Sequence, residues 1–385
     1  MPPSWLDRLQ RATLLLTAFL YSGGYATAGL VAILLAVVLE GVISRRLPWD
    51  KTRLDFLIAA FIAAFLLSGA LSPYRPVALS SVGLAALTIY LAYGLTARIL
   101  RRDPRVLTQM LWTWVIGGLL TAVWAIILHF QTNTAASTPT LGQNAVGTTM
   151  VLTIVVALGL GLSIRTPLRY VAVGVTIVAT AALLFTYARG AWLGLLASLV
   201  LLIGFGGRKV ARAGLVAGVM VLVVGATVGR GERSVLATRA LTILRPAVHQ
   251  SRIFLLRSAV MIFFHNPVLG TGMNTFPLVY PRYRLPDDVN PPDARPNAHN
   301  IVLNMAAEGG LLGLGLFLAV LVQTFRLGWR WQLAGADGGT RALRMSLLTA
   351  LAGILVHQLF DGTLLSVHLG AGMWMLIAVV AASDR

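Results

Sequence analysis

The stretch AVGTTMVLTIVVALGLGLS, residues 145–163, contains no charged side chain. A helix that crosses the hydrocarbon core of a bilayer needs about 20 predominantly apolar residues, and this stretch supplies them. Across the whole chain, 57% of the residues are hydrophobic, 11% are charged, and the mean hydropathy is +0.80. A water-soluble globular protein does not have this composition. The sequence therefore predicts an all-α, polytopic integral membrane protein.

Similar apolar runs recur along the chain, and about twelve transmembrane helices are expected from them. The runs cover residues 12–22, 26–43, 54–71, 77–96, 108–130, 145–163, 168–186, 190–205, 210–228, 305–325, 343–360 and 366–382. Because they extend along nearly the whole sequence, residues 1–385 are expected to form a single membrane domain. The first run is followed at once by the second and has no convincing A-x-A cleavage site, so no cleavable signal peptide is expected.

Basic turns between alternate apolar runs indicate the topology. They lie at residues 44–53, 97–105, 163–169, 206–212, 325–331 and 340–344. The positive-inside rule makes these turns, and with them both termini, cytoplasmic. The net charge of +18 is distributed as membrane topology requires, so nucleic acid is not expected as a partner. The chain has no cysteine, which excludes disulfides, cysteine-ligated metals and a thiol nucleophile.

The longest hydrophilic interval, residues 230–300, is expected to be a large periplasmic loop with helices at the membrane interface. It contains nine of the 31 Lys and Arg residues. Long loops cross the membrane largely regardless of charge, so these arginines need another explanation. An anionic, phosphate-bearing ligand is one, and contact with lipid headgroups is the other. Within the loop, SRIFLLRSAVMIFFH (251–265) is too short and too charged to span the bilayer, and predicts an interfacial helix that ends at Asn266-Pro267.

The motifs of common cofactor sites are missing from the sequence. It has no GxxxxGK[ST], no GxGxxG after a strand and no HExxH, so neither a nucleotide nor a metal cofactor is expected. Ionisable residues are scarce at the centres of the predicted spans, where proton-coupled transporters need them. This favours chemistry at the outer interface. A polysaccharide or lipid transporter or flippase is the alternative from another class, and it would show inverted repeats and broken, charged helices.

Arg189 is a candidate ligand-binding residue within TYARGAWLG, where one predicted helix ends and the next begins. The planar guanidinium group of arginine forms paired hydrogen bonds with phosphate oxygens. The alternative is an arginine that only extends to the membrane boundary. Gly190 would allow a ligand to approach the backbone.

His299 is a candidate base at the start of a predicted helix, because a neutral imidazole accepts a proton near pH 7. Asn300 beside it could orient a hydroxyl group. Glu308 lies in a helix that enters lipid, so its carboxylate must be paired or protonated, either against an arginine or against His299. The remaining histidines are assigned structural roles: His129, His249, His265, His357 and His368.

Three motifs together resemble those of the O-antigen ligase and O-antigen polymerase superfamily of bacterial membrane glycosyltransferases. The first is the pattern His-Asn-x-x-Leu-x4-Glu-x-Gly-x-x-Gly formed by His299, Asn300, Leu303, Glu308, Gly310 and Gly313. The second is TYARGAWLG, and the third is SRIFLLRSAVMIFFHNPVLGTGMNTF, with Leu256 where the family often has tryptophan. The resemblance covers about residues 140–330.

The resemblance implies a glycosyltransferase C-like fold and an active site on the periplasmic side of the bacterial inner membrane. The donor would be a glycan on undecaprenyl diphosphate, and no cofactor or metal would be needed. Arg189, Arg252 and, as a third candidate, Arg257 would bind the diphosphate. His299 would deprotonate the acceptor hydroxyl, and direct attack would invert the anomeric carbon.

The acceptor expected from the closest motif match is the lipid A-core, which makes the chain a ligase. An O-antigen or exopolysaccharide polymerase would use a second lipid-linked repeat unit as acceptor, and the same residues would serve it. A protein is a third possible acceptor. A non-catalytic scaffold of polysaccharide export is a further alternative, and it would tolerate His299→Ala.

Overall fold

The computed structural model describes residues 4–45, 49–207, 211–212, 214–219, 223, 235–238, 241, 250–291, 296–334 and 337–383. In this part of the chain the regular elements are helices, and no strand occurs. They are α1 (Ser4–Ser22), α2 (Ala26–Ser44), α3 (Asp55–Leu71), α4 (Arg75–Ile89), η1 (Tyr90–Gly94), α5 (Leu95–Arg102), α6 (Val106–Thr132), α7 (Gln143–Ser163), α8 (Leu168–Phe185), α9 (Arg189–Phe205), α12 (Gln250–His265), α13 (Phe276–Val279), η3 (Tyr280–Arg282), α14 (Ile301–Leu333), α15 (Gly338–Gln358), η4 (Thr363–Leu365) and α16 (Val367–Ala382). The all-α prediction is confirmed.

The predicted apolar runs coincide with helices wherever the structure describes them, and of the run at 210–228 it describes only residues 211–212, 214–219 and 223. Among the described helices, seven are long and apolar enough to cross a membrane, and α3, α9 and α16 are shorter apolar helices. α1 carries Asp7, Arg8 and Arg11 in its first half. A polytopic membrane protein is thus confirmed, but the predicted number of about twelve spans is not.

Helix α7, which contains the uncharged stretch quoted first, is packed on several sides. It contacts α6, α8, α9 and α15. Small residues make this possible: a Cβ atom on Gly147 would lie 2.8 Å from Cβ of Ala191, and one on Gly159 would lie 2.6 Å from Cβ of Ser346. Close approach through small residues is typical of helix packing in membranes. α7 therefore holds α9 and α15 at fixed positions.

A buried ion pair joins the first helices. Arg98 of α5 donates to both carboxylate oxygens of Glu40 in α2, at 2.6 and 2.5 Å. Gln10 of α1 donates to the same carboxylate at 2.5 Å. Because a charge in the bilayer must be paired, these three side chains fix α1, α2 and α5 relative to one another.

Helix α14 is broken at Gly310, which has φ 60° and ψ −163°. The preceding loop fills the break: the N–H groups of Leu311 and Leu312 donate to the carbonyl oxygens of Pro267 and Val268, at 2.8 and 3.2 Å. A Cβ atom on Gly310 would lie 2.3 Å from the Val268 carbonyl. The predicted apolar run 305–325 is therefore interrupted within α14, where protein backbone rather than lipid meets the helix.

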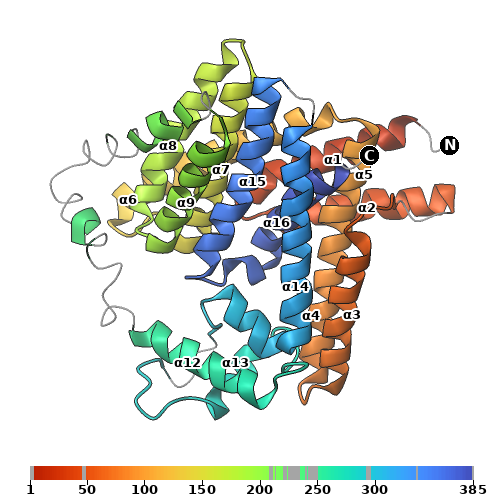
Figure 1. The fold of residues 1–385 in the computed structure, drawn as a ribbon, viewed down its shortest axis with the longest axis vertical. Coiled ribbons are helices and arrows are strands. Elements are labelled where there is room, and N and C mark those ends of the chain that lie inside the picture. The colour runs from red at the N-terminus through yellow and green to blue at the C-terminus, as the bar shows by residue number, and fades with distance from the viewer. Residues whose placement is uncertain are drawn as a thin grey trace.

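Helices α12 and α13 lie together at one end of the molecule (Figure 1). α12 ends at His265, directly before Asn266, as the sequence predicts. A separate apolar cluster binds it to the start of α14, formed by Leu255, Ala259, Ile262, Phe276, Val279, Tyr280, Ala298 and Ala307. Since Ala298 belongs to this cluster, the segment that carries His299 is held in place by the loop helices.

Candidate functional site

One pocket of about 200 Å³ brings together residues from distant parts of the chain. Arg189 at the start of α9, Arg252 of α12 and His299 before α14 all line it. Its other lining residues are Gln143, Asn144, Tyr187, Ala188, Gly190, Leu193, Ile253, Leu256, His357, Leu359 and Phe360. Three residues that the sequence singled out for phosphate binding and proton transfer thus share one pocket.

Two helices begin at this pocket. α7 starts at Gln143 and α9 starts at Arg189, and the N-cap residues, Gly142 and Ala188, have no side chain that could cap these starts. The N-terminus of a helix carries a partial positive charge and backbone N–H groups that suit an anion. Together with the guanidinium groups of Arg189 and Arg252, these two helix starts make this end of the pocket electropositive. Such an end is suited to a phosphate-bearing ligand.

The turn between α8 and α9 fixes the position of Arg189. Tyr187 adopts a left-handed conformation with φ 53°, and the N–H group of Ala188 donates to Thr186 Oγ1 at 3.2 Å. A Cβ atom on Gly190 would lie 2.9 Å from Cδ2 of His357. The sequence assigned Gly190 to the approach of a ligand, but in the structure it lets α9 approach the imidazole of His357.

Asp361, which the sequence analysis did not single out, is the partner of His299. Its Oδ1 atom lies 3.2 Å from His299 Nδ1 and also accepts from the Gly362 N–H group at 2.7 Å. The Asp361 residue is only 4% exposed, whereas the His299 side chain is 32% exposed. Burial raises the pKa of the Asp361 carboxyl group, but the hydrogen bond with His299 and the interaction with His357 outweigh it and lower that pKa. The carboxylate is therefore ionised at neutral pH.

His357 lies on the other side of the same carboxylate. Its Nε2 atom is 4.0 Å from Asp361 Oδ2, and its Nδ1 atom is 2.9 Å from Thr148 Oγ1. The sequence assigned His357 a structural role, and in the structure the end of α15 brings this residue to the pocket beside α9. The spacing His357-x3-Asp361 at a predicted helix end is the sequence signal that could have drawn attention to both residues.

The chain around His299 is held by its neighbours. His299 has φ 46°, an uncommon conformation for a residue other than glycine, and its N–H group donates to Asn297 Oδ1 at 2.8 Å. Asn300 caps α14 by accepting from the Leu303 N–H group at 3.0 Å and donates to the Leu359 carbonyl at 3.0 Å. Asn300 thus fixes the His299 segment to the end of α15. The sequence had suggested a different role for Asn300, the orientation of a hydroxyl group.

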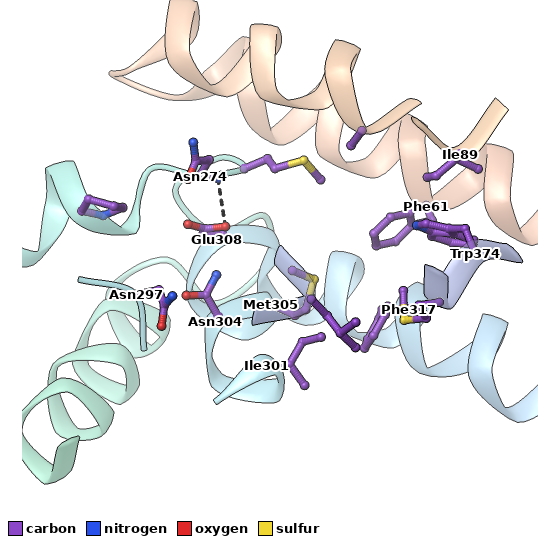
Figure 2. A pocket seen from close by; sticks show the side chains of 15 residues that line it. Phe61, Ile89, Asn274, Asn297, Ile301, Asn304, Met305, Glu308, Phe317 and Trp374 are labelled. Atoms are coloured by element: carbon purple, nitrogen blue, oxygen red, sulfur yellow. Dashed lines mark hydrogen bonds between the residues drawn. The ribbon is translucent and has the colours of Figure 1, made fainter. Parts of the chain in front are cut away.

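Glu308 is buried and binds the loop backbone. Its carboxylate accepts from the N–H groups of Asn274 and Phe276, at 2.9 and 3.0 Å, and Figure 2 shows the contact with Asn274. The sequence suggested an arginine or His299 as the partner of Glu308. In the described contacts its role is instead to hold the 266–276 loop against α14.

Arg257, the third candidate for diphosphate binding, is exposed on α12. It is not among the residues that line the pocket, although Arg252 and Leu256 of the same helix are. Of these two arginines of α12, Arg252 therefore lines the pocket and Arg257 does not.

The arrangement combines two chemical functions in one pocket. The arginines and helix starts can stabilise negative charge that develops on a leaving group. The imidazole of His299 can accept a proton, and a carboxylate on its Nδ1 atom fixes the tautomer and stabilises the imidazolium ion that forms. Both are needed for a transfer from a phosphorylated donor to a hydroxyl group.

Residues 174–318 match the family model described as O-antigen ligase. The matched range includes Arg189, Arg252, His299 and Glu308, whereas Asp361 lies beyond it. No curated protein matches the chain. The family match confirms the resemblance that the three motifs indicate. Residues 174–318 of the chain are therefore similar to the O-antigen ligase family.

Proposed function

We propose that the chain is an O-antigen ligase-type glycosyltransferase of the bacterial inner membrane. It transfers a glycan from undecaprenyl diphosphate to a hydroxyl group of the lipid A-core on the periplasmic side, with inversion and without metal or nucleotide. The observation that carries the proposal is the single pocket that joins Arg189 and Arg252 to His299.

The donor end of the reaction is assigned to the electropositive end of the pocket. When the bond between the anomeric carbon and the diphosphate oxygen breaks, negative charge develops on the leaving diphosphate. Arg189, Arg252 and the first turns of α7 and α9 line the pocket where that charge would be stabilised. A lipid diphosphate is already an activated leaving group, so nucleotide hydrolysis is not required.

An apolar groove next to this end supports a donor with a lipid tail. The groove has a volume of about 450 Å³ and is lined by Trp192, Leu195, Leu199 and Ile203 of α9, together with residues of α8 and of 214–219. α9 therefore presents Arg189 to the pocket and a continuous apolar face to the groove. A lipid-linked donor has matching parts, because its diphosphate suits the pocket with Arg189 and its isoprenoid chain suits the apolar groove.

The acceptor end is assigned to His299 and Asp361. An acceptor hydroxyl that attacks the anomeric carbon must lose its proton, and His299 takes it. Asp361, at 3.2 Å from Nδ1, keeps the ring oriented and favours the charged form once the proton has moved. Direct displacement of the diphosphate on the opposite face of the sugar gives inversion.

The test is transfer by the purified protein from an undecaprenyl-diphosphate glycan, without metal or nucleotide, to lipid A-core or to a second donor molecule. Product on lipid A-core that falls roughly 10²- to 10⁴-fold in His299→Ala supports the ligase. Lengthening of the lipid-linked chain instead makes the protein a polymerase. Full activity of His299→Ala removes His299 as the base.

The same preparation tests transport. In proteoliposomes, a transporter or flippase would move the lipid-linked glycan between leaflets and leave its diphosphate bond intact. Movement without bond cleavage, and no transfer to either acceptor, would overturn the proposed enzyme.

A further inference from the structure

A second cavity lies beside the segment that carries His299. It has a volume of about 170 Å³, and Asn297 and Ile301 line it, whereas His299 between them lines the first pocket. The cavity has two unlike ends (Figure 2). Asn274, Asn297, Asn304 and Glu308 gather at one, and aromatic and aliphatic side chains, which include Phe61, Ile89, Phe317 and Trp374, gather at the other.

The polar end offers amide side chains from separate segments. Asn274 belongs to the loop before α13, Asn297 precedes α14, and Asn304 lies in its first turns. Asn297 Oδ1 accepts from the His299 N–H group at 2.8 Å, and Asn304 Oδ1 accepts from the Ala298 N–H group at 3.2 Å. These contacts fix both amides, the Asn304 side chain is also hydrogen-bonded to the Glu308 carboxylate, and both asparagines line the cavity. An amide both donates and accepts, which matches the hydroxyl groups of a sugar.

Among the described residues that line this cavity there is no arginine or lysine. A diphosphate would be bound there without a counter-charge and beside the carboxylate of Glu308, so the cavity does not suit the donor's anionic part. The apolar end, with the rings of Phe61, Phe317 and Trp374, suits the C–H faces of a neutral ligand or a hydrocarbon group. The first pocket is therefore suited to the anionic donor, and this cavity is suited to an uncharged part of the acceptor.

We propose that this cavity binds a neutral sugar residue of the acceptor glycan. The inference rests on the proposed glycosyl transfer and adds a binding site for the second substrate. The Asn297 side chain accepts a hydrogen bond from the His299 N–H group, so a sugar held by Asn297 and Asn304 has its neighbouring residue at the His299 segment. An oligosaccharide with one sugar in this cavity and the next sugar at the His299 segment would present a hydroxyl group to the imidazole of His299.

Ala85 provides a test that leaves the polar end untouched. It lines the cavity from α4, and Ala85→Phe would fill the space, with Ala85→Leu as a smaller step. The matched control is Leu84→Phe, because Leu84 is the neighbouring residue on α4, is 50% exposed and does not line the cavity. We expect Ala85→Phe to raise KM for the acceptor roughly tenfold or more, with an unchanged KM for the lipid-linked donor. An unchanged acceptor KM, or an equal rise for both substrates, would overturn the inference.

A binding measurement separates this inference from the proposed function. A photoreactive alkyl glucoside should cross-link to the cavity in the wild type, for example near Met273 or Met305, and inorganic diphosphate should not compete. Ala85→Phe should abolish the cross-link and Leu84→Phe should retain it. Cross-linking of this kind without any glycosyl transfer would contradict only the proposed function, whereas cross-links elsewhere in a protein that transfers glycans would contradict only the acceptor site.

Discussion

The Asp361 carboxylate lies 3.2 Å from Nδ1 of His299, although 62 residues separate them in the sequence. The carboxylate is buried and hydrogen-bonded to the Gly362 N–H group, so it cannot turn away from the ring. His299 itself lines the pocket. The proposed reaction therefore depends on Asp361 as well as on His299.

Asp361→Asn should therefore reduce kcat roughly 10²- to 10⁴-fold, because asparagine cannot stabilise the imidazolium ion that forms during transfer. Donor KM should change little, since the arginines remain. Steady-state transfer to lipid A-core measures both constants. Asp288→Asn is a useful comparison, because Asp288 is also buried but interacts with Tyr280 and Arg284. A similar loss of kcat in both variants would indicate general damage to the fold rather than a role for Asp361.

The pH dependence follows from the lowered pKa of Asp361. A carboxyl group whose pKa is lower in the folded state contributes stability that is present above the unfolded value, about 3.9 for Asp. That stability is lost only as the pH falls through the lower folded value. Between about pH 7 and pH 5 the Asp361 carboxylate should therefore stay ionised, and the stability that it contributes should persist. Thermal unfolding of the wild type and of Asp361→Asn should differ by a constant amount across this range, and a difference that disappears by pH 5 would contradict the assignment.

Arg189→Lys and Arg252→Lys should each weaken use of the donor. Lysine keeps the charge but cannot form the paired hydrogen bonds of a guanidinium group, and a hydrogen bond to a charged group contributes about 1.5–3 kcal/mol. We expect kcat/KM for the lipid-linked donor to fall roughly 10- to 150-fold. The control is Arg257→Lys, on the same helix as Arg252 but outside the pocket. An equal loss in Arg257→Lys would show that the whole face of α12, not the pocket, binds the donor.

Gly310→Ala should destabilise the protein, because its Cβ atom would lie 2.3 Å from the Val268 carbonyl at a residue with φ 60°. Strained backbone of this kind costs about 1–3 kcal/mol before the steric clash is added. Gly315→Ala, in the same helix, has nothing within 4 Å of the added atom and should be neutral or stabilising. Thermal unfolding in detergent compares the two variants. Equal unfolding temperatures would contradict the break in α14.

Glu40→Ala should lower the free energy of unfolding by about 3–5 kcal/mol, because it leaves Arg98 charged, buried and without its carboxylate. Arg11→Ala removes the ion pair with Asp103, in which both side chains are partly exposed, and should cost less than about 1 kcal/mol. Chemical unfolding of both variants in the same micelles tests this. A small effect of Glu40→Ala would mean that water reaches Arg98.

Hydropathy predicted the helices well, because the bilayer requires long apolar runs whatever their neighbours are. The shared location of Arg189, Arg252 and His299 could be proposed from the sequence only through the family motifs. The role of Asp361 could not be predicted, since no local sequence pattern indicates that the turn after α15 contacts the segment before α14. That contact depends on how α9, α14 and α15 pack.

The break at Gly310 and the role of Glu308 could not be predicted either, because both depend on contacts between two segments. Glycine is frequent in membrane helices, so Gly310 gives no local sign of a break. A buried glutamate suggests a charged partner, but Glu308 is bound by two backbone N–H groups of the loop. Both features arise where two segments meet, and a pattern along one segment does not record the other.

The interlocking of Pro267 and Val268 with the broken helix also constrains biogenesis. In lipid, each N–H or C=O group left without a partner costs several kcal/mol, so α14 is stable at its break only when the 266–276 segment is already beside it. That segment precedes α14 in the chain, so we expect translocation of the loop and completion of the broken helix to be coupled steps.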